Sequence, residues 1–89
     1  MKFTVEYSKK AEKEIDKLDR NIRRFILSWI NKNLVGCENP RQYGSALTGN
    51  HKNHWRYRIG NYRVIADIKD DKITIVIITV GHRKNAYDE

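Results

Sequence analysis

The chain has 89 residues, of which 39% are hydrophobic and 33% charged, and its 18 lysines and arginines against 11 acidic residues give a net charge of +7. This length suits a single domain over residues 1–89 with a modest core, and the excess of positive charge attracts polyanions. Cys37 is the single cysteine, so the chain forms no internal disulfide, and no run of about 18 apolar residues indicates a membrane helix. We therefore expect a cytoplasmic protein without a membrane partner.

The N-terminal third predicts a strand followed by two helices. Phe3, Val5 and Tyr7 alternate with polar residues and indicate a short strand over residues 2–7. Ser8 is a good N-cap for a first helix of about ten residues. A second helix is expected from about residue 21 to residue 34, after a break near Asp19 that suits an antiparallel helical hairpin. Its apolar stripe contains Ile22, Phe25, Ile26, Trp29, Ile30 and Leu34.

The middle of the chain, residues 36–53, is predicted to be a long loop. It contains Pro40, Gly44, Gly49 and several asparagines, with a helical turn expected at residues 40–43. Cys37 lies in this loop without a nearby histidine partner, which favours an incidental cysteine over a catalytic one.

The C-terminal third predicts three strands over residues 54–59, 62–69 and 72–80. The turns between them are expected at Gly60-Asn61 and Asp70-Asp71. The last strand is apolar on both faces, which indicates an interior position in the sheet. The expected fold is α+β: an N-terminal strand, an antiparallel two-helix hairpin, and a three-stranded antiparallel meander that completes a four-stranded sheet with the helices on one face.

Several arginines are predicted to share the other face of that sheet. A turn at residues 60–61 places Arg58 directly opposite Arg63, and strand alternation adds Arg56 to the same face. Trp55 and Tyr57 then point toward the helices. Like charges that face each other destabilise a sheet, and the segment between residues 39 and 66 contains no acidic residue. This arrangement favours an anion-binding site.

Phosphate chemistry fits this pattern better than metal or nucleotide chemistry. His51, His54 and His82 lack the neighbouring ligands of known metal motifs, and no glycine-rich nucleotide loop is present. Arginine grips phosphoryl oxygens in a bidentate manner, and interleaved aromatic side chains can stack on unpaired bases. We therefore expect no metal and no cofactor.

The combination of Leu47-Thr-Gly49, Trp55-Arg-Tyr-Arg-Ile-Gly-Asn-Tyr-Arg63, Gly81-His-Arg83 and Tyr87 resembles the RelE/ParE superfamily of bacterial and archaeal toxins. The resemblance covers essentially the whole chain and implies a RelE-like fold. Members of the RelE branch are ribosome-dependent endoribonucleases that cut messenger RNA in the ribosomal A site, and an antitoxin encoded beside them holds them inactive. Members of the ParE branch instead poison DNA gyrase.

The resemblance also implies roles for individual residues. Arg63 corresponds to the arginine that neutralises the scissile phosphate, Arg83 to the one that stabilises or protonates the leaving oxygen, and Tyr87 to the tyrosine that stacks on the RNA. Arg56 and Arg58 align with two lysines of the family. Because arginine does not readily lose its proton, either this pair acts only electrostatically or the proton acceptor lies elsewhere, with Lys52, His54 and His82 as candidates. The residues expected to bind RNA are Lys52, His54, His82 and Lys84.

The resemblance implies the toxin of a type II toxin–antitoxin system, a metal-independent endoribonuclease in which the 2′-hydroxyl attacks the adjacent phosphate. The expected partners are messenger RNA in the ribosomal A site and a cognate antitoxin with an acidic, partly disordered segment. Two alternatives stay open at this point. The first is a ParE-like inhibitor of DNA gyrase, and the second is a nucleic-acid-binding domain whose charge is only a phosphate footprint.

Overall fold

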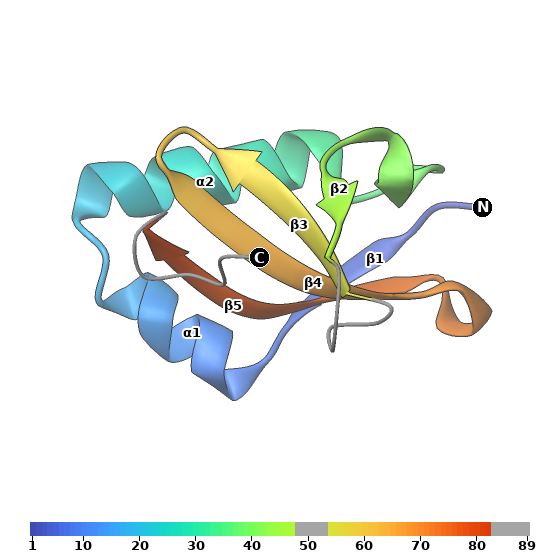
Figure 1. The fold of residues 1–89 in the computed structure, drawn as a ribbon, viewed down its shortest axis with the longest axis horizontal. Coiled ribbons are helices and arrows are strands. Elements are labelled where there is room, and N and C mark those ends of the chain that lie inside the picture. Colours follow the sequence, from blue (N-terminus) through green and yellow to red (C-terminus); the bar gives the residue numbers. More distant parts are fainter. Residues whose placement is uncertain (48–53, 83–89) are drawn as a thin grey trace.

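The computed structural model describes residues 1–47 and 54–82, and it confirms the α+β class (Figure 1). The helices are α1 (Lys9–Asp16) and α2 (Arg20–Asn33), with short 3₁₀ turns at Pro40–Gln42 and Asp70–Lys72. The strands are β1 (Thr4–Tyr7), β2 (Ser45–Ala46), β3 (His54–Ile59), β4 (Tyr62–Lys69) and β5 (Thr74–His82). They form one five-stranded sheet in the order β1-β5-β4-β3-β2, in which β1 runs parallel to β5 and the other pairs are antiparallel.

Side-chain caps start both helices where the sequence suggests. The Ser8 hydroxyl accepts a hydrogen bond from the Ala11 amide at 3.0 Å and donates one to the Ile78 carbonyl at 2.8 Å, so the start of α1 is tied to β5. The Asp19 carboxylate caps α2 through the Asn21 amide at 3.1 Å. These caps satisfy amide groups that the first helical turn leaves without a partner.

The hydrophobic core lies between the two helices and one face of the sheet. It takes buried residues from α1, from α2 and its C-cap Leu34, and from the three long strands, among them Ala11, Ile15, Ile26, Ile30, Tyr57, Ile59, Val64, Ile75 and Ile77. Phe25, which the sequence places on the same apolar stripe, is 53% exposed. Its ring lies beside the β3–β4 turn instead, where a Cβ added to Gly60 would lie 3.1 Å from it.

Two local features differ from the prediction. The sheet has five strands rather than four, because Ser45–Ala46 pairs with β3. The second turn is longer than a tight Asp70-Asp71 turn: a 3₁₀ turn occupies Asp70–Lys72, and Ile73 follows in the left-handed region with a φ of +49°. The Ile73 carbonyl accepts the Thr4 amide at 3.0 Å, so this conformation places the acceptor that starts the β1–β5 pairing.

Candidate functional site

The β3–β4 hairpin opposes two arginines, as predicted from its turn. Ile59 pairs with Tyr62 and Arg58 pairs with Arg63, and Gly60 has a φ of +59°, as in hairpin turns that place glycine first. Directly opposed residues have Cβ atoms about 4.5–5.5 Å apart. The two arginine side chains therefore start side by side on the same face of the sheet.

Arg56, Arg58 and Arg63 lie on the sheet face that points away from the helices, and we call this set the arginine face. Arg58 is exposed, whereas Arg56 and Arg63 are each only 8% exposed. Arg56 lies opposite the fully buried Ile65 on β4, so its aliphatic stem has apolar surface beside it. The face is thus less open to solvent than strand alternation alone indicates.

The other face of β3 fixes the strand to the preceding loop. The Trp55 indole Nε1 donates to the Tyr43 carbonyl and the Tyr57 hydroxyl donates to the Pro40 carbonyl, both at 2.6 Å. The Trp29 ring packs against Tyr57 with ring centroids 5.7 Å apart. Burial raises the pKa of Tyr57, which keeps its phenol a neutral donor. The side chains of Trp55 and Tyr57 therefore lie on the core side of the sheet, as predicted.

The same loop is also tied to the β4–β5 turn. Arg41 makes a bidentate ion pair with Asp70, with Nη1–Oδ1 and Nη2–Oδ2 distances of 3.0 and 2.8 Å. The guanidinium holds the pKa of the Asp70 carboxyl below its usual value. Arg41 belongs to the acid-free segment of the sequence, but its charge is matched by this carboxylate and it is not part of the arginine face.

The two described histidines are separated from the Arg58–Arg63 pair, His54 by its position along the strand and His82 by the sheet itself. His54 is on the arginine face, opposite Asp67. It is four residues from Arg58, which corresponds to about 13 Å along the strand. His82 pairs with Tyr62, with ring centroids 5.2 Å apart, and so lies on the helix side of the sheet. The structure brings together Arg56, Arg58 and Arg63, but it does not bring His82 to them.

Four of the predicted site residues, Lys52, Arg83, Lys84 and Tyr87, lie outside the described residues. Their roles stay predictions. Ser45 also lies at this site, although no pattern in the sequence predicts it, and its Oγ accepts a hydrogen bond from Arg56 Nη2 at 2.9 Å. The nearest signal is Gly44, a residue that allows close backbone approach just before a polar side chain.

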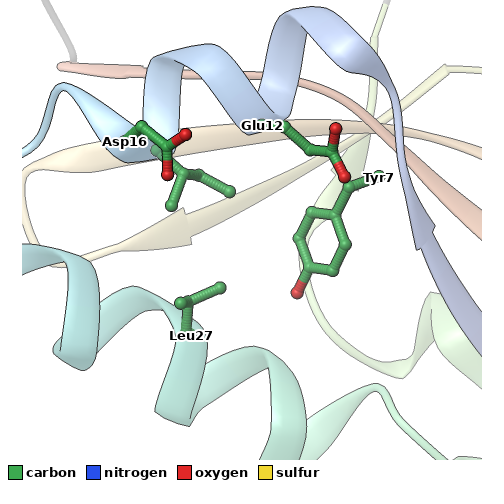
Figure 2. A pocket seen from close by; sticks show the side chains of 5 residues that line it. Tyr7, Glu12, Asp16 and Leu27 are labelled. Carbon is green, nitrogen blue, oxygen red and sulfur yellow. The ribbon is translucent and has the colours of Figure 1, made fainter.

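Two hollows lie on the helix side of the sheet. The larger, of about 410 Å³, is lined by Tyr7, Glu12, Ile15, Asp16 and Leu27. Figure 2 shows the two carboxylates on α1 and Leu27 across from them on α2. The smaller hollow, of about 330 Å³, includes Glu14 and His82. The larger hollow is lined by two carboxylates and no basic residue, so it does not suit a phosphate ligand, whereas the smaller hollow combines Glu14 with Lys17 and His82.

The described residues were compared with three other kinds of feature: a metal site, a membrane-spanning helix and a reactive cysteine. Within residues 1–47 and 54–82, no group of three histidine, cysteine or acidic side chains is placed to hold a metal ion. No helix in that part of the chain is both long enough and apolar enough to cross a membrane. Burial raises the pKa of the Cys37 thiol, which disfavours the reactive thiolate. The arginine face is therefore the candidate site.

This chain is similar in sequence and in fold to known toxins. A family model described as the ParE toxin of the type II toxin–antitoxin system parDE matches residues 5–87. The chain is 28% identical to Toxin RelG of Mycobacterium tuberculosis over 87 residues, which is 98% of each chain. It resembles the toxin–antitoxin complex RelBE2 of the same organism with a TM-score of 0.84 and 26% identity, covering 96% of this chain and 95% of the other. The archaeal RelE–RelB complex of Pyrococcus horikoshii shares the fold, with a TM-score of 0.72, 22% identity, and coverage of 97% and 100%.

Proposed function

The chain belongs to the ParE toxin family of type II toxin–antitoxin systems, and we propose that it acts in the RelE manner, by cutting messenger RNA in the ribosomal A site. The observation that carries this proposal is the opposed Arg58–Arg63 pair, with Arg56 on the same face. Arginine side chains that lie side by side suit the oxygens of a phosphate group. The phosphate of an RNA backbone is the ligand that we propose for them.

The proposed reaction needs no group from outside the chain and its substrate. The 2′-hydroxyl gives its proton to an acceptor as its oxygen attacks the adjacent phosphorus, the bond to the 5′-oxygen breaks, and that oxygen takes up a proton, so that a 2′,3′-cyclic phosphate and a 5′-hydroxyl result. Negative charge grows on the phosphoryl oxygens in the transition state, and fixed cations stabilise it there. Arg63 and Arg58 are proposed to hold these oxygens. DNA lacks the 2′-hydroxyl and is not expected to be cut.

The proton of the 2′-hydroxyl needs an acceptor other than an arginine. The position of His82 on the helix side of the sheet argues against it, and the distance of His54 from Arg58 suits a contact to a neighbouring nucleotide better than proton transfer. We therefore assign His54 to RNA binding. Lys52 is the remaining candidate acceptor from the sequence, and it lies outside the described residues.

We infer that a cognate antitoxin holds the toxin inactive. Solved structures that resemble this chain are complexes of RelE-like toxins with RelB-like antitoxins. The net charge of +7 favours an acidic partner. The antitoxin is expected to carry an acidic segment that folds as it binds.

One observation favours a second function, inhibition of DNA gyrase. The family model that matches this chain is that of the ParE toxin of parDE systems, and members of the ParE branch poison DNA gyrase. The arginine face favours RNA cleavage over this alternative, because arginines side by side suit the oxygens of a phosphate backbone.

Controlled expression in bacteria separates these functions. We expect induction to stop translation and to create new transcript 5′ ends within reading frames. The double variant Arg58→Gln/Arg63→Gln should lose both effects. Arg24→Gln, which removes an exposed charge from α2, is the matched control and should keep them. Intact transcripts together with inhibited supercoiling by purified gyrase would instead support the ParE-like function.

A further inference from the structure

The short strand β2 supplies a polar partner to the arginine face. Ser45 pairs directly with Arg56, and Arg56 Nη2 donates to Ser45 Oγ at 2.9 Å. Ser45 is exposed, whereas Arg56 is 8% exposed. The hydroxyl thus holds one end of a largely buried guanidinium at the edge of the sheet.

The path of the preceding loop makes this contact possible. Gly44 has a φ of +78°, and a Cβ added there would lie 2.2 Å from the Arg56 carbonyl oxygen. Only glycine allows the loop to approach β3 this closely. The hydrogen bonds from Trp55 to the Tyr43 carbonyl and from Tyr57 to the Pro40 carbonyl hold the same loop from the other side.

From this arrangement we propose that Ser45 is a positioning residue, which directs the Arg56 guanidinium toward the RNA phosphate. The inference rests on the proposed function and deepens it. A long arginine side chain has many rotamers, and a hydrogen bond to one of its five N–H donors restricts them. A serine is a neutral acceptor, so it orients the group without cancelling its charge. Asp70, by contrast, matches the charge of Arg41.

A double-mutant cycle tests the proposal with purified toxin and messenger RNA in a reconstituted translation system. Ser45→Ala should lower kcat roughly tenfold, the effect of one hydrogen bond to a charged group. Ser45→Thr keeps the hydroxyl and should restore most of the rate. In an Arg56→Ala background, Ser45→Ala should have no further effect, because its role passes through the guanidinium. Ser28→Ala, an exposed serine on α2, is the matched control.

Different outcomes overturn different claims. An equal loss in both backgrounds would mean that Ser45 contacts RNA itself or supports folding, and an unchanged kcat in Ser45→Ala would remove the positioning role. Nitrogen-detected NMR of the Arg56 guanidinium tests the proposal without RNA. Rotation about its Nε–Cζ bond should be faster in Ser45→Ala than in the parent, and an unchanged rate contradicts the inference. If the parent cleaves no RNA, the proposed function fails, while the NMR comparison still decides whether Ser45 orients Arg56.

Discussion

The hydrogen bond from Tyr57 to the Pro40 carbonyl should contribute measurably to stability. Tyr57 is fully buried, Pro40 is also buried, and the bond is 2.6 Å long. Tyr57→Phe keeps the ring beside Trp29 and leaves a buried carbonyl without its donor, which costs about 1–3 kcal/mol. For a domain of this size, each 1 kcal/mol lowers the melting temperature by roughly 4–8 °C. We therefore expect a fall of roughly 4 °C or more, and a matching loss in urea denaturation at pH 7.

The same variant should change how stability depends on pH. Burial raises the pKa of Tyr57 above its ordinary value of 10.0, so above that pH the unfolded chain loses the phenolic proton before the folded chain does. Stability then falls as the pH rises through 10 toward the folded-state pKa. In Tyr57→Phe, stability should therefore fall less steeply above pH 10 than in the parent. Some decrease should remain, because burial also raises the pKa of Tyr7.

The control for both measurements is Tyr43→Phe, because the Tyr43 hydroxyl makes no hydrogen bond within the described residues, although its ring packs on Trp29. Equal urea midpoints for Tyr57→Phe and the parent at pH 7 would refute the stabilising role of the bond. An unchanged alkaline slope would refute the assignment of that slope to Tyr57.

Three further substitutions have defined outcomes. Gly44→Ala should destabilise the fold by more than the roughly 1–2 kcal/mol that an alanine costs in the left-handed conformation, because the added Cβ would clash with the β3 backbone. Gly36→Ala is the control, because Gly36 has the same φ of +78° and no atom within 4 Å of the added Cβ. The difference between the melting temperatures of the two variants measures the clash. Asp70→Asn should lower the melting temperature slightly at pH 7, and the gap should close as the pH falls below 3.8, since Arg41 lowers the carboxyl pKa and the pair stabilises only the ionised form. Arg63→Gln should melt at or above the parent temperature but lose the stabilisation by inorganic phosphate that we expect of the parent; a large drop in its melting temperature would mark Arg63 as a structural residue.

The hairpin was the most predictable part of the fold. Alternation in residues 54–69 and the Gly60-Asn61 turn gave the bounds and register of β3 and β4 as the structure has them. The two-residue β2 is too short to show a period of two, so no pattern predicts it. The β4–β5 connection also differed, because the left-handed Ile73 is a conformation that a β-branched residue rarely adopts.

The arrangement of the site was predictable in part. Strand alternation placed Arg56, Arg58 and Arg63 on one face, but it carries no information about burial or about the Ser45 contact. The position of His82 depends on an irregularity of β5. Ile65 pairs with Thr79 and Ala66 with Ile77, so the register shifts there. This shift reverses the alternation beyond that point, and it places His82 with Tyr62 on the helix side.

The two faces of β3 have different roles: one face holds the strand in the fold, and the other is proposed to bind RNA. Like charges on directly opposed residues do not favour a strand pair, so the pairing of Arg58 with Arg63 by itself adds nothing to the stability of the hairpin. The opposite face of the same strand carries Trp55 and Tyr57, whose hydrogen bonds hold the strand to the preceding loop. Because the side chains alternate, a change on one face leaves the contacts of the other intact. The arginine face is therefore carried by a strand whose backbone the loop and the core residues hold in place.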